Sequence, residues 1–137
     1  MDQDLRARYQ SSEYVIEDDP PIRFEIDETH QGLGLLLLSF GVEEAIWLTA
    51  YNPGSQRRDE GENLDDQMRL LSQIEAARLN YFMGHSMDQH GDWYEPSYLV
   101  LGLNQEEGVR LGQAFGQVAV IRIDVEGTPR LISTEAT

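Results

Sequence analysis

The sequence predicts a single α+β domain spanning residues 1–137, with an N-terminal β-hairpin, then alternating helices and strands, and a mixed sheet covered by helices. Three observations lead to this prediction. Leu, Ile, Val and Phe occupy 35 positions, which is enough for a hydrophobic core. The segments 45–51 and 98–103 are typical of buried strands because they carry no charged side chain. The segment 63–81 carries apolar side chains at helical spacing.

The N-terminal part of the chain contains a predicted hairpin and a predicted short helix. Residues 1–12 are polar, and we expect them to be frayed or to form a short helical lead. Residues 13–28 hold two short apolar runs separated by an Asp-Asp-Pro-Pro turn signal, so we predict a β-hairpin there. The apolar run 32–40 fits a buried strand or a short helix. Gly41 directly after it favours the helix, because glycine often ends helices.

The central part is predicted to contain a strand, a helix and a long loop. The segment 45–51 is rich in β-branched and aromatic residues and stops at an Asn-Pro-Gly turn signal, as expected for a buried strand. The segment 83–97 has neither helical nor strand periodicity, and we interpret it as a long loop that is ordered by its two adjacent aromatic residues. Between this strand and this loop we predict a helix, which Asn63 can cap. Its predicted core positions are Leu64, Met68, Leu71, Ile74, Ala77 and Tyr81.

The C-terminal part is predicted to add three strands and one helix. The segment 98–103 has almost no polar side chain and reads as a strand covered on both faces. Asn104 opens a capping-box pattern, which predicts a helix that ends near Gly116. The segment 118–123 is a further buried strand, and 129–133 is a candidate edge strand.

The charge of the chain excludes several classes of partner. Ten basic residues, all Arg, face 25 acidic residues, so the formal net charge is −15. Phosphates and anionic membranes repel such a chain, and we expect neither nucleic acid nor membrane as a partner. A charged start and the lack of a long apolar stretch predict a cytoplasmic location. The absence of Cys excludes disulfides, thiolate nucleophiles and zinc–cysteine clusters.

Four short segments occur in a specific order and spacing between about Ala45 and Ile123. They are Thr49 to Pro53 with Ser55, the pair Glu62-Asn63, Trp93 with Glu95-Pro96 before the strand Tyr98 to Gly102, and Phe115 to Gln117 with Ala119-Val120. Together they resemble the bacterial family catalogued as domain of unknown function 3293. The resemblance implies a family identity without an agreed activity. It therefore strengthens the fold and site interpretations and leaves the chemistry open.

The loop from Asn52 to Asn63 is a candidate anion-binding site. It leaves the carboxyl end of a predicted strand and enters a helix N-terminus, where free backbone N–H groups and the helix dipole attract anions. Arg57 and Arg58 lie in this loop and could clamp a phosphate or carboxylate. The alternative is an ordinary turn and a helix cap, with both arginines paired to neighbouring carboxylates in solvent.

Trp93, Glu95 and Gln117 are further candidates for a polar ligand site. An aromatic face beside a carboxylate suits stacking and hydrogen bonding to a nucleobase or sugar, and a desolvated Glu95 would suit general acid–base catalysis. Alternatively, Trp93 covers the edge of the core and Glu95 is solvated. Gln117 is either a functional amide or a local partner for a helix end.

Five potential metal ligands lie close together in the predicted long loop. Their spacing matches no helical ligand pair, and a metal site needs three or four convergent ligands. We therefore predict no metal site, and the sequence identifies no cofactor. The five residues are His85, Asp88, His90, Asp92 and Glu95.

One shared site requires a particular strand orientation. Asn52 follows its predicted strand, whereas Trp93, Glu95 and Gln117 precede theirs. These residues meet at one edge of the sheet only if strand 45–51 runs antiparallel to strands 98–103 and 118–123. We hypothesise this arrangement.

Two functional hypotheses follow from the sequence. The first is a polar pocket that binds or processes a small anionic nucleotide- or sugar-like molecule, with Glu95 as the candidate catalytic group. No obvious nucleophile is present, so binding without catalysis stays equally open. Its ligand-binding residues would be Asn52, Arg57, Arg58, Glu62, Asn63, Trp93 and Gln117.

The second hypothesis is an acidic interaction protein without catalytic activity, such as a nucleic-acid mimic that occupies a basic protein partner. The first 30 residues support it, because they carry nine acidic side chains and three Arg.

Overall fold

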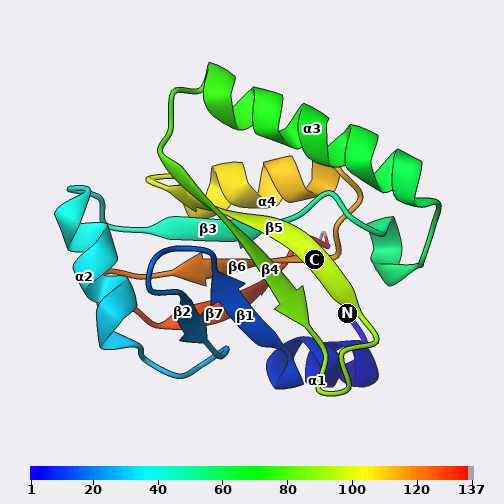
Figure 1. Ribbon diagram of the computed structural model, residues 1–137, viewed down its shortest axis with the longest axis horizontal. Coiled ribbons are helices and arrows are strands. Elements are labelled where there is room, and N and C mark those ends of the chain that lie inside the picture. Colours follow the sequence, from blue (N-terminus) through cyan, green and yellow to red (C-terminus); the bar gives the residue numbers. More distant parts are fainter. Residues whose placement is uncertain (136–137) are drawn as a thin grey trace.

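The computed structural model describes residues 1–135, and all of its strands belong to one curled, seven-stranded sheet that resembles a half-barrel (Figure 1). The strand order is β2-β1-β4-β5-β3-β6-β7, and every neighbouring pair is antiparallel. The strands are β1 (Glu13–Ile16), β2 (Ile22–Phe24), β3 (Ala45–Leu48), β4 (Tyr81–Met87), β5 (Tyr94–Leu101), β6 (Ala119–Ile123) and β7 (Pro129–Ser133).

Helices lie on both faces of the sheet. The helices α3 (Glu60–Ala76) and α4 (Gln105–Ala114) lie together on one face, whereas α2 (Gln31–Ser39) lies on the other face and α1 (Gln3–Ser11) at one end of it (Figure 1). Alternate residues of the central strand β3 point to the two sides. Ile46 and Leu48 belong to the core beneath α3 and α4, and Ala45 and Trp47 belong to the core on the α2 side. Each face of the sheet therefore has its own hydrophobic core.

The predicted mixed sheet with alternating helices and strands is wrong. Six of the seven strands form three antiparallel pairs of consecutive strands, β1–β2, β4–β5 and β6–β7, and only β3 stands between two helices. The absence of charges in 45–51 and 98–103 reflects burial on both faces, which is typical of parallel sheets. Here an antiparallel sheet is buried on both faces, because helices and the curl of the sheet cover them.

Several local predictions are confirmed. The N-terminal hairpin is β1–β2, the apolar run 32–40 lies mainly in α2, and 129–133 is the edge strand β7. Asn104 caps α4, because its Oδ1 accepts a 2.8 Å hydrogen bond from the Glu107 backbone N–H. Residues 1–12 are not frayed but contain α1, which Asp2 caps through a 2.7 Å hydrogen bond from the Leu5 backbone N–H.

The long loop predicted at 83–97 is wrong, because most of it forms the hairpin β4–β5. The sequence of β4 shows no strand pattern, because its one buried position is Gly84, which has no side chain. A Cβ at Gly84 would lie 2.5 Å from Cη2 of Trp47, so only glycine lets the two strands and the indole pack this closely.

The start and the buried face of α3 also differ from the prediction. Asp59 caps the helix, and Asn63 lies one turn inside it. The buried positions are Asn63, Gln67, Leu70 and Ile74. Leu64 and Met68, which directly follow the buried residues Asn63 and Gln67, were predicted to face the core. They are instead 45% and 64% exposed. Amide side chains thus occupy half of the buried face of this helix.

No helix in the part of the chain that the structure covers is both long enough and apolar enough to cross a bilayer.

Candidate functional site

The strand directions bring Asn52 and Glu95 to the same edge of the sheet. β3 runs antiparallel to both β5 and β6, the orientation that a shared site requires. The Asn52 side-chain Nδ2 donates a 3.0 Å hydrogen bond to Glu95 Oε2. At the start of β6, Gln117 Nε2 donates to the Tyr51 carbonyl at 3.0 Å. Three of the candidate residues therefore meet at this edge.

Asn52 and Ser55 stand on a tightly wound turn that follows β3. The 3₁₀ turn η1 (Pro53–Ser55) follows Asn52 directly, and Asn52, Gly54 and Ser55 all adopt left-handed backbone angles, with φ of 47°, 67° and 61°. This conformation is easy for glycine and tolerable for Asn, but it costs Ser about 1 kcal/mol or more. The turn holds the Ser55 hydroxyl 3.2 Å from the hydroxyl of Tyr9 in α1.

A network of buried amides fixes the side chain of Asn52. Asn63 Oδ1 accepts from the Asn52 backbone N–H at 2.8 Å, and Asn63 Nδ2 donates to Asn52 Oδ1 at 2.9 Å. These bonds orient the Asn52 amide so that its Nδ2 points at Glu95. Asn63 is thus a positioning residue rather than a helix cap.

Arg58 extends the same network toward the solvent. Its Nε donates to Asn63 Oδ1 at 2.7 Å, and its Nη2 donates to the Ala50 carbonyl at 3.1 Å and to Asp66 Oδ2 at 2.8 Å. The side chains of Arg58 and Asp66 are each 22% exposed. Since these bonds engage its guanidinium, Arg58 is a structural residue and does not face the cavity described below.

Gln67 closes the network on the side of β5. Its Oε1 accepts from the Ala50 backbone N–H at 2.8 Å, and its Nε2 donates to the Pro96 carbonyl at 3.1 Å. It therefore ties the end of β3 to the start of β5. Sequence reasoning missed Gln67, although positions 63, 67, 70 and 74 share one face of a helix.

Glu95 is a partly buried carboxyl with an altered acidity. Burial raises the pKa of Glu95 to about 7, and the hydrogen bonds from the Asn52 and Trp93 side chains and the charge of Arg8 offset only part of this effect. A carboxyl with a pKa near 7 can accept or release a proton under neutral conditions. Among residues 1–135 it has no cationic partner within 4.0 Å.

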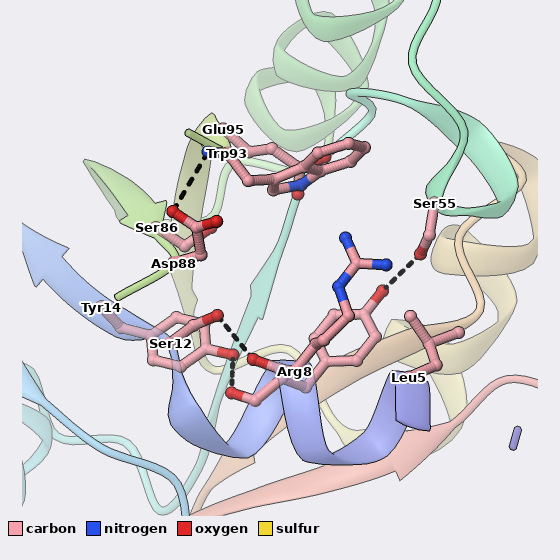
Figure 2. Close-up of a pocket in the computed structure, with 10 residues that line it drawn as sticks. Leu5, Arg8, Ser12, Tyr14, Ser55, Ser86, Asp88, Trp93 and Glu95 are labelled. Atoms are coloured by element: carbon pink, nitrogen blue, oxygen red, sulfur yellow. Dashed lines mark hydrogen bonds between the residues drawn. The ribbon is translucent and has the colours of Figure 1, made fainter. Parts of the chain in front are cut away.

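A small cavity of about 40 Å³ lies between α1 and the sheet edge that carries Glu95 (Figure 2). A second cavity of about 30 Å³ lies deeper, toward Trp47, Gln117 and Leu131. The two cavities share walls made by Tyr9, Tyr14, Ser86 and Glu95. The first is further lined by Leu5, Arg8, Ser12, Ser55, Asp88 and Trp93.

Two guanidinium groups lie over the ring of Trp93, which lines the first cavity. The Cζ atoms of Arg57 and Arg8 lie 4.8 Å and 5.3 Å from the ring centroid. Figure 2 shows the Arg8 side chain extending from α1 toward the indole. Arg57 also donates to the Asp92 carbonyl. Of the two arginines predicted to bind an anion, Arg57 is therefore the one that remains at the surface, over the Trp93 ring.

The structure does not bring every predicted residue together. The Glu62 side chain is 65% exposed, lies 4.0 Å from Arg58 and does not line the cavity. In residues 1–135, no group of three or more His, Asp and Glu residues is arranged to hold a metal ion. Arg8 and Tyr9 line the cavity but were missed, because no motif marks them and only the folded chain carries α1 to the site.

Comparison with known proteins identifies a family. The family described as "Protein of unknown function (DUF3293)" matches residues 48–120, from the end of β3 into β6. The match includes Asn52, Asn63, Trp93, Glu95 and Gln117, whereas α1 lies outside it. Neither the curated proteins nor the solved structures gave a match. Since the match covers more than half of its length, the chain belongs to the family of proteins of unknown function DUF3293.

Proposed function

We propose that this chain binds a small polar ligand through the carboxyl of Glu95. The observation that carries the proposal is a partly buried carboxyl which lacks a cationic partner in the described chain and which a network of amides holds against a cavity. Burying such a group is unfavourable for folding, because a charge loses its hydration there. Since the carboxyl of Glu95 does not stabilise the fold, we infer that it serves to accept a hydrogen bond from a ligand.

The surroundings of Glu95 indicate the chemistry of the ligand. The Trp93 ring provides a planar surface for a base or sugar ring. Arg57 and Arg8, two of only ten basic residues, lie beside it and would attract an anionic group in an otherwise acidic protein. We therefore favour a small anionic molecule that resembles a nucleotide or a sugar phosphate.

Catalysis is an extension of this proposal. The pKa of Glu95, raised to about 7 by burial, is suitable for a general acid or base, and Asn52 would hold its carboxyl in place. The hydroxyl of Ser55 is near but pairs with Tyr9. Binding is thus the central claim, and proton transfer by Glu95 is the reaction step that the site best supports.

We place the protein in the cytoplasm, since its acidic, cysteine-free composition fits a reducing compartment.

The proposal can be tested with three defined probes. We suggest thermal shift and isothermal titration calorimetry with adenosine 5′-monophosphate, glucose 6-phosphate and 4-hydroxybenzoate, alongside native mass spectrometry of molecules that co-purify. At least one probe should stabilise the wild type and the Glu43→Gln control, whose side chain is exposed and lines neither cavity, but not Glu95→Gln. Binding that is equal in all three proteins would contradict a role for Glu95.

A second candidate function is the docking of a basic partner on an acidic surface. One observation favours it: Glu25, Glu28 and Asp88, together with the ion pair between Glu13 and Arg23, line a groove of about 540 Å³ beside the edge strand β2. Repulsion by Glu28 raises the pKa of Glu25, so the carboxylates are crowded. An oligoarginine peptide should then bind at low salt and lose affinity in the double variant Glu25→Gln, Glu28→Gln, while Glu95→Gln leaves binding unchanged.

A further inference from the structure

The proposed ligand site has no room for a ring while α1 is in place. The two cavities beside Glu95 measure about 40 Å³ and about 30 Å³. A cavity of roughly 150 Å³ takes one benzene molecule, whereas spaces as small as these hold only a few waters. A ring that enters this space beside Glu95 must therefore displace part of the protein.

Tyr9 is one of the four residues that line both cavities, and the only one of them that belongs to α1. Its hydroxyl lies 3.2 Å from Ser55 Oγ. Burial, and to a smaller degree the nearby charge of Glu95, raises the pKa of the Tyr9 phenol. A planar ring with a hydroxyl on its edge thus already occupies the space between the Trp93 side of the site and the interior of the sheet.

Tyr9 is also the wall that is most easily moved. The other shared walls belong to the sheet, and Tyr14 packs against the rings of Phe24 and Trp47, which also contact each other. In contrast, α1 has nine residues and none of them is fully buried. Helices of this length are marginal without tertiary support.

Few polar contacts hold α1 against the rest of the protein. Tyr9 pairs with Ser55 and Arg8 lies over Trp93. The Tyr14 hydroxyl donates to the Tyr9 carbonyl at 2.6 Å, and an exposed ion pair joins the Met1 amino group to Glu135. Apart from the last pair, every one of these contacts involves the lining of the cavity, so a ligand in the cavity would compete with them directly.

We propose that Tyr9 occupies the place of the ligand, that α1 moves away when the ligand binds, and that the ligand contains a planar ring with a hydroxyl or N–H on its edge. This inference rests on the proposed function and adds the ligand class and an autoinhibitory contact. When Tyr9 leaves, its space and both cavities merge into one. Ser55 and Glu95 then face the polar edge of the ligand, and Trp93, released by Arg8, offers its face for stacking.

The test uses 4-methylphenol, which is the side chain of tyrosine, and the full-length protein. We expect Tyr9→Ala to bind this probe about tenfold more tightly than the wild type, because no internal ring competes. Tyr9→Phe keeps the ring but loses the bond to Ser55, and it should show a smaller gain. Tyr94→Ala removes a half-exposed tyrosine that does not line the cavities, and it should bind like the wild type.

Two further measurements test whether Tyr9 takes the place of the ligand or whether 4-methylphenol only fills the space that Tyr9→Ala leaves. In the Tyr9→Ala background, Glu95→Gln should weaken binding several-fold, whereas filling of an apolar hole would not depend on Glu95. In the wild type, saturating 4-methylphenol should speed amide hydrogen exchange in residues 3–11. The exchange experiment needs no variant, so it decides the case even if Tyr9→Ala does not fold.

The possible outcomes distinguish this inference from the proposed function. If a probe binds in a Glu95-dependent way but α1 exchange is unchanged or slower, the displacement of α1 is wrong and the ligand site stands. If Tyr9→Ala and Tyr9→Phe bind 4-methylphenol no better than the wild type, Tyr9 does not occupy the ligand's place. If neither 4-methylphenol nor the three earlier probes bind any variant, both ideas fail.

Discussion

The side-chain amide of Asn52 donates a hydrogen bond of 3.0 Å to the carboxylate of Glu95, 43 positions further along the chain. This contact joins the turn after β3 to the start of β5. It depends on a left-handed backbone at Asn52, with φ of 47°, and on Asn63, which pairs with both the backbone and the side chain of Asn52. Backbone strain and buried polar contacts thus converge on one residue beside the cavity.

Substitution of Asn52 should separate these two contributions. Asn52→Gly removes the amide and keeps a backbone that accepts φ of 47°, so we expect a loss of about 1–3 kcal/mol of unfolding free energy from unpaired partners. Asn52→Ala should lose about 1 kcal/mol more, because alanine disfavours left-handed angles. Urea unfolding measures both values. Equal stability of the two variants would contradict the strain at this position.

The pKa of Glu95 predicts a pH dependence of stability. Folding raises this pKa from 4.5 to about 7, so the folded state binds the proton more tightly than the unfolded state. The stabilising effect of protonation is complete below about pH 4.5 and is lost as the pH rises toward 7. Relative to Glu95→Gln, which cannot ionise, the wild type should lose up to about 3 kcal/mol across this window.

This pH dependence can be measured by urea unfolding of both proteins at about pH 5 and about pH 8. The other acid in the cavity, Asp88, has a lowered pKa: burial raises it, but backbone hydrogen bonds from Trp93 and Asp92 and the charge of His90 outweigh that effect. Asp88 therefore stays ionised throughout the window. A constant stability difference between wild type and Glu95→Gln would show that Glu95 titrates like an exposed carboxyl.

Much of the fold could be read from local sequence signals, and the exceptions have physical causes. Turn signals and a capping box identified the first hairpin and the start of α4, because such signals act within a few residues. The strand β4 escaped notice because its one fully buried position, Gly84, has no side chain to show a pattern. The antiparallel sheet could not be predicted from the apolar runs, because such runs occur wherever both faces of a sheet are covered. Strand direction depends on how the whole chain folds.

The candidate site was also predictable from the sequence only in part. The hypothesis of a shared site depended on chain geometry, since an end of one strand and the starts of two others meet only in an antiparallel arrangement. Arg8 and Tyr9 could not be found this way, because their place beside Ser55 and Trp93 arises from the docking of α1. The adjacent arginines at 57 and 58 looked alike in sequence, but they have different roles in the structure.

The two adjacent arginines should therefore respond differently to the same substitution. Arg58→Met removes the partner of a carboxylate and of an amide that are largely buried, and we expect a loss of about 2 kcal/mol or more. Arg57→Met removes an exposed contact with Trp93 and should cost less than about 1 kcal/mol. Chemical denaturation of both variants provides the comparison. Similar losses in the two proteins would mean that Arg58 is as solvated as its neighbour.

The buried face of α3 gives the last prediction, because it reverses the ordinary rule for amphipathic helices. Gln67→Leu should destabilise the protein by about 1–3 kcal/mol although it adds an apolar side chain, since the Ala50 N–H would lose its buried acceptor. Met68→Gln, at the next position, should change stability by less than about 0.5 kcal/mol, because Met68 is 64% exposed. Thermal and urea unfolding of this pair tests which face of α3 packs on the sheet. If Met68→Gln were the more damaging change, the helix would be rotated by about one residue, and the amide network that holds Asn52 against Glu95 could not form.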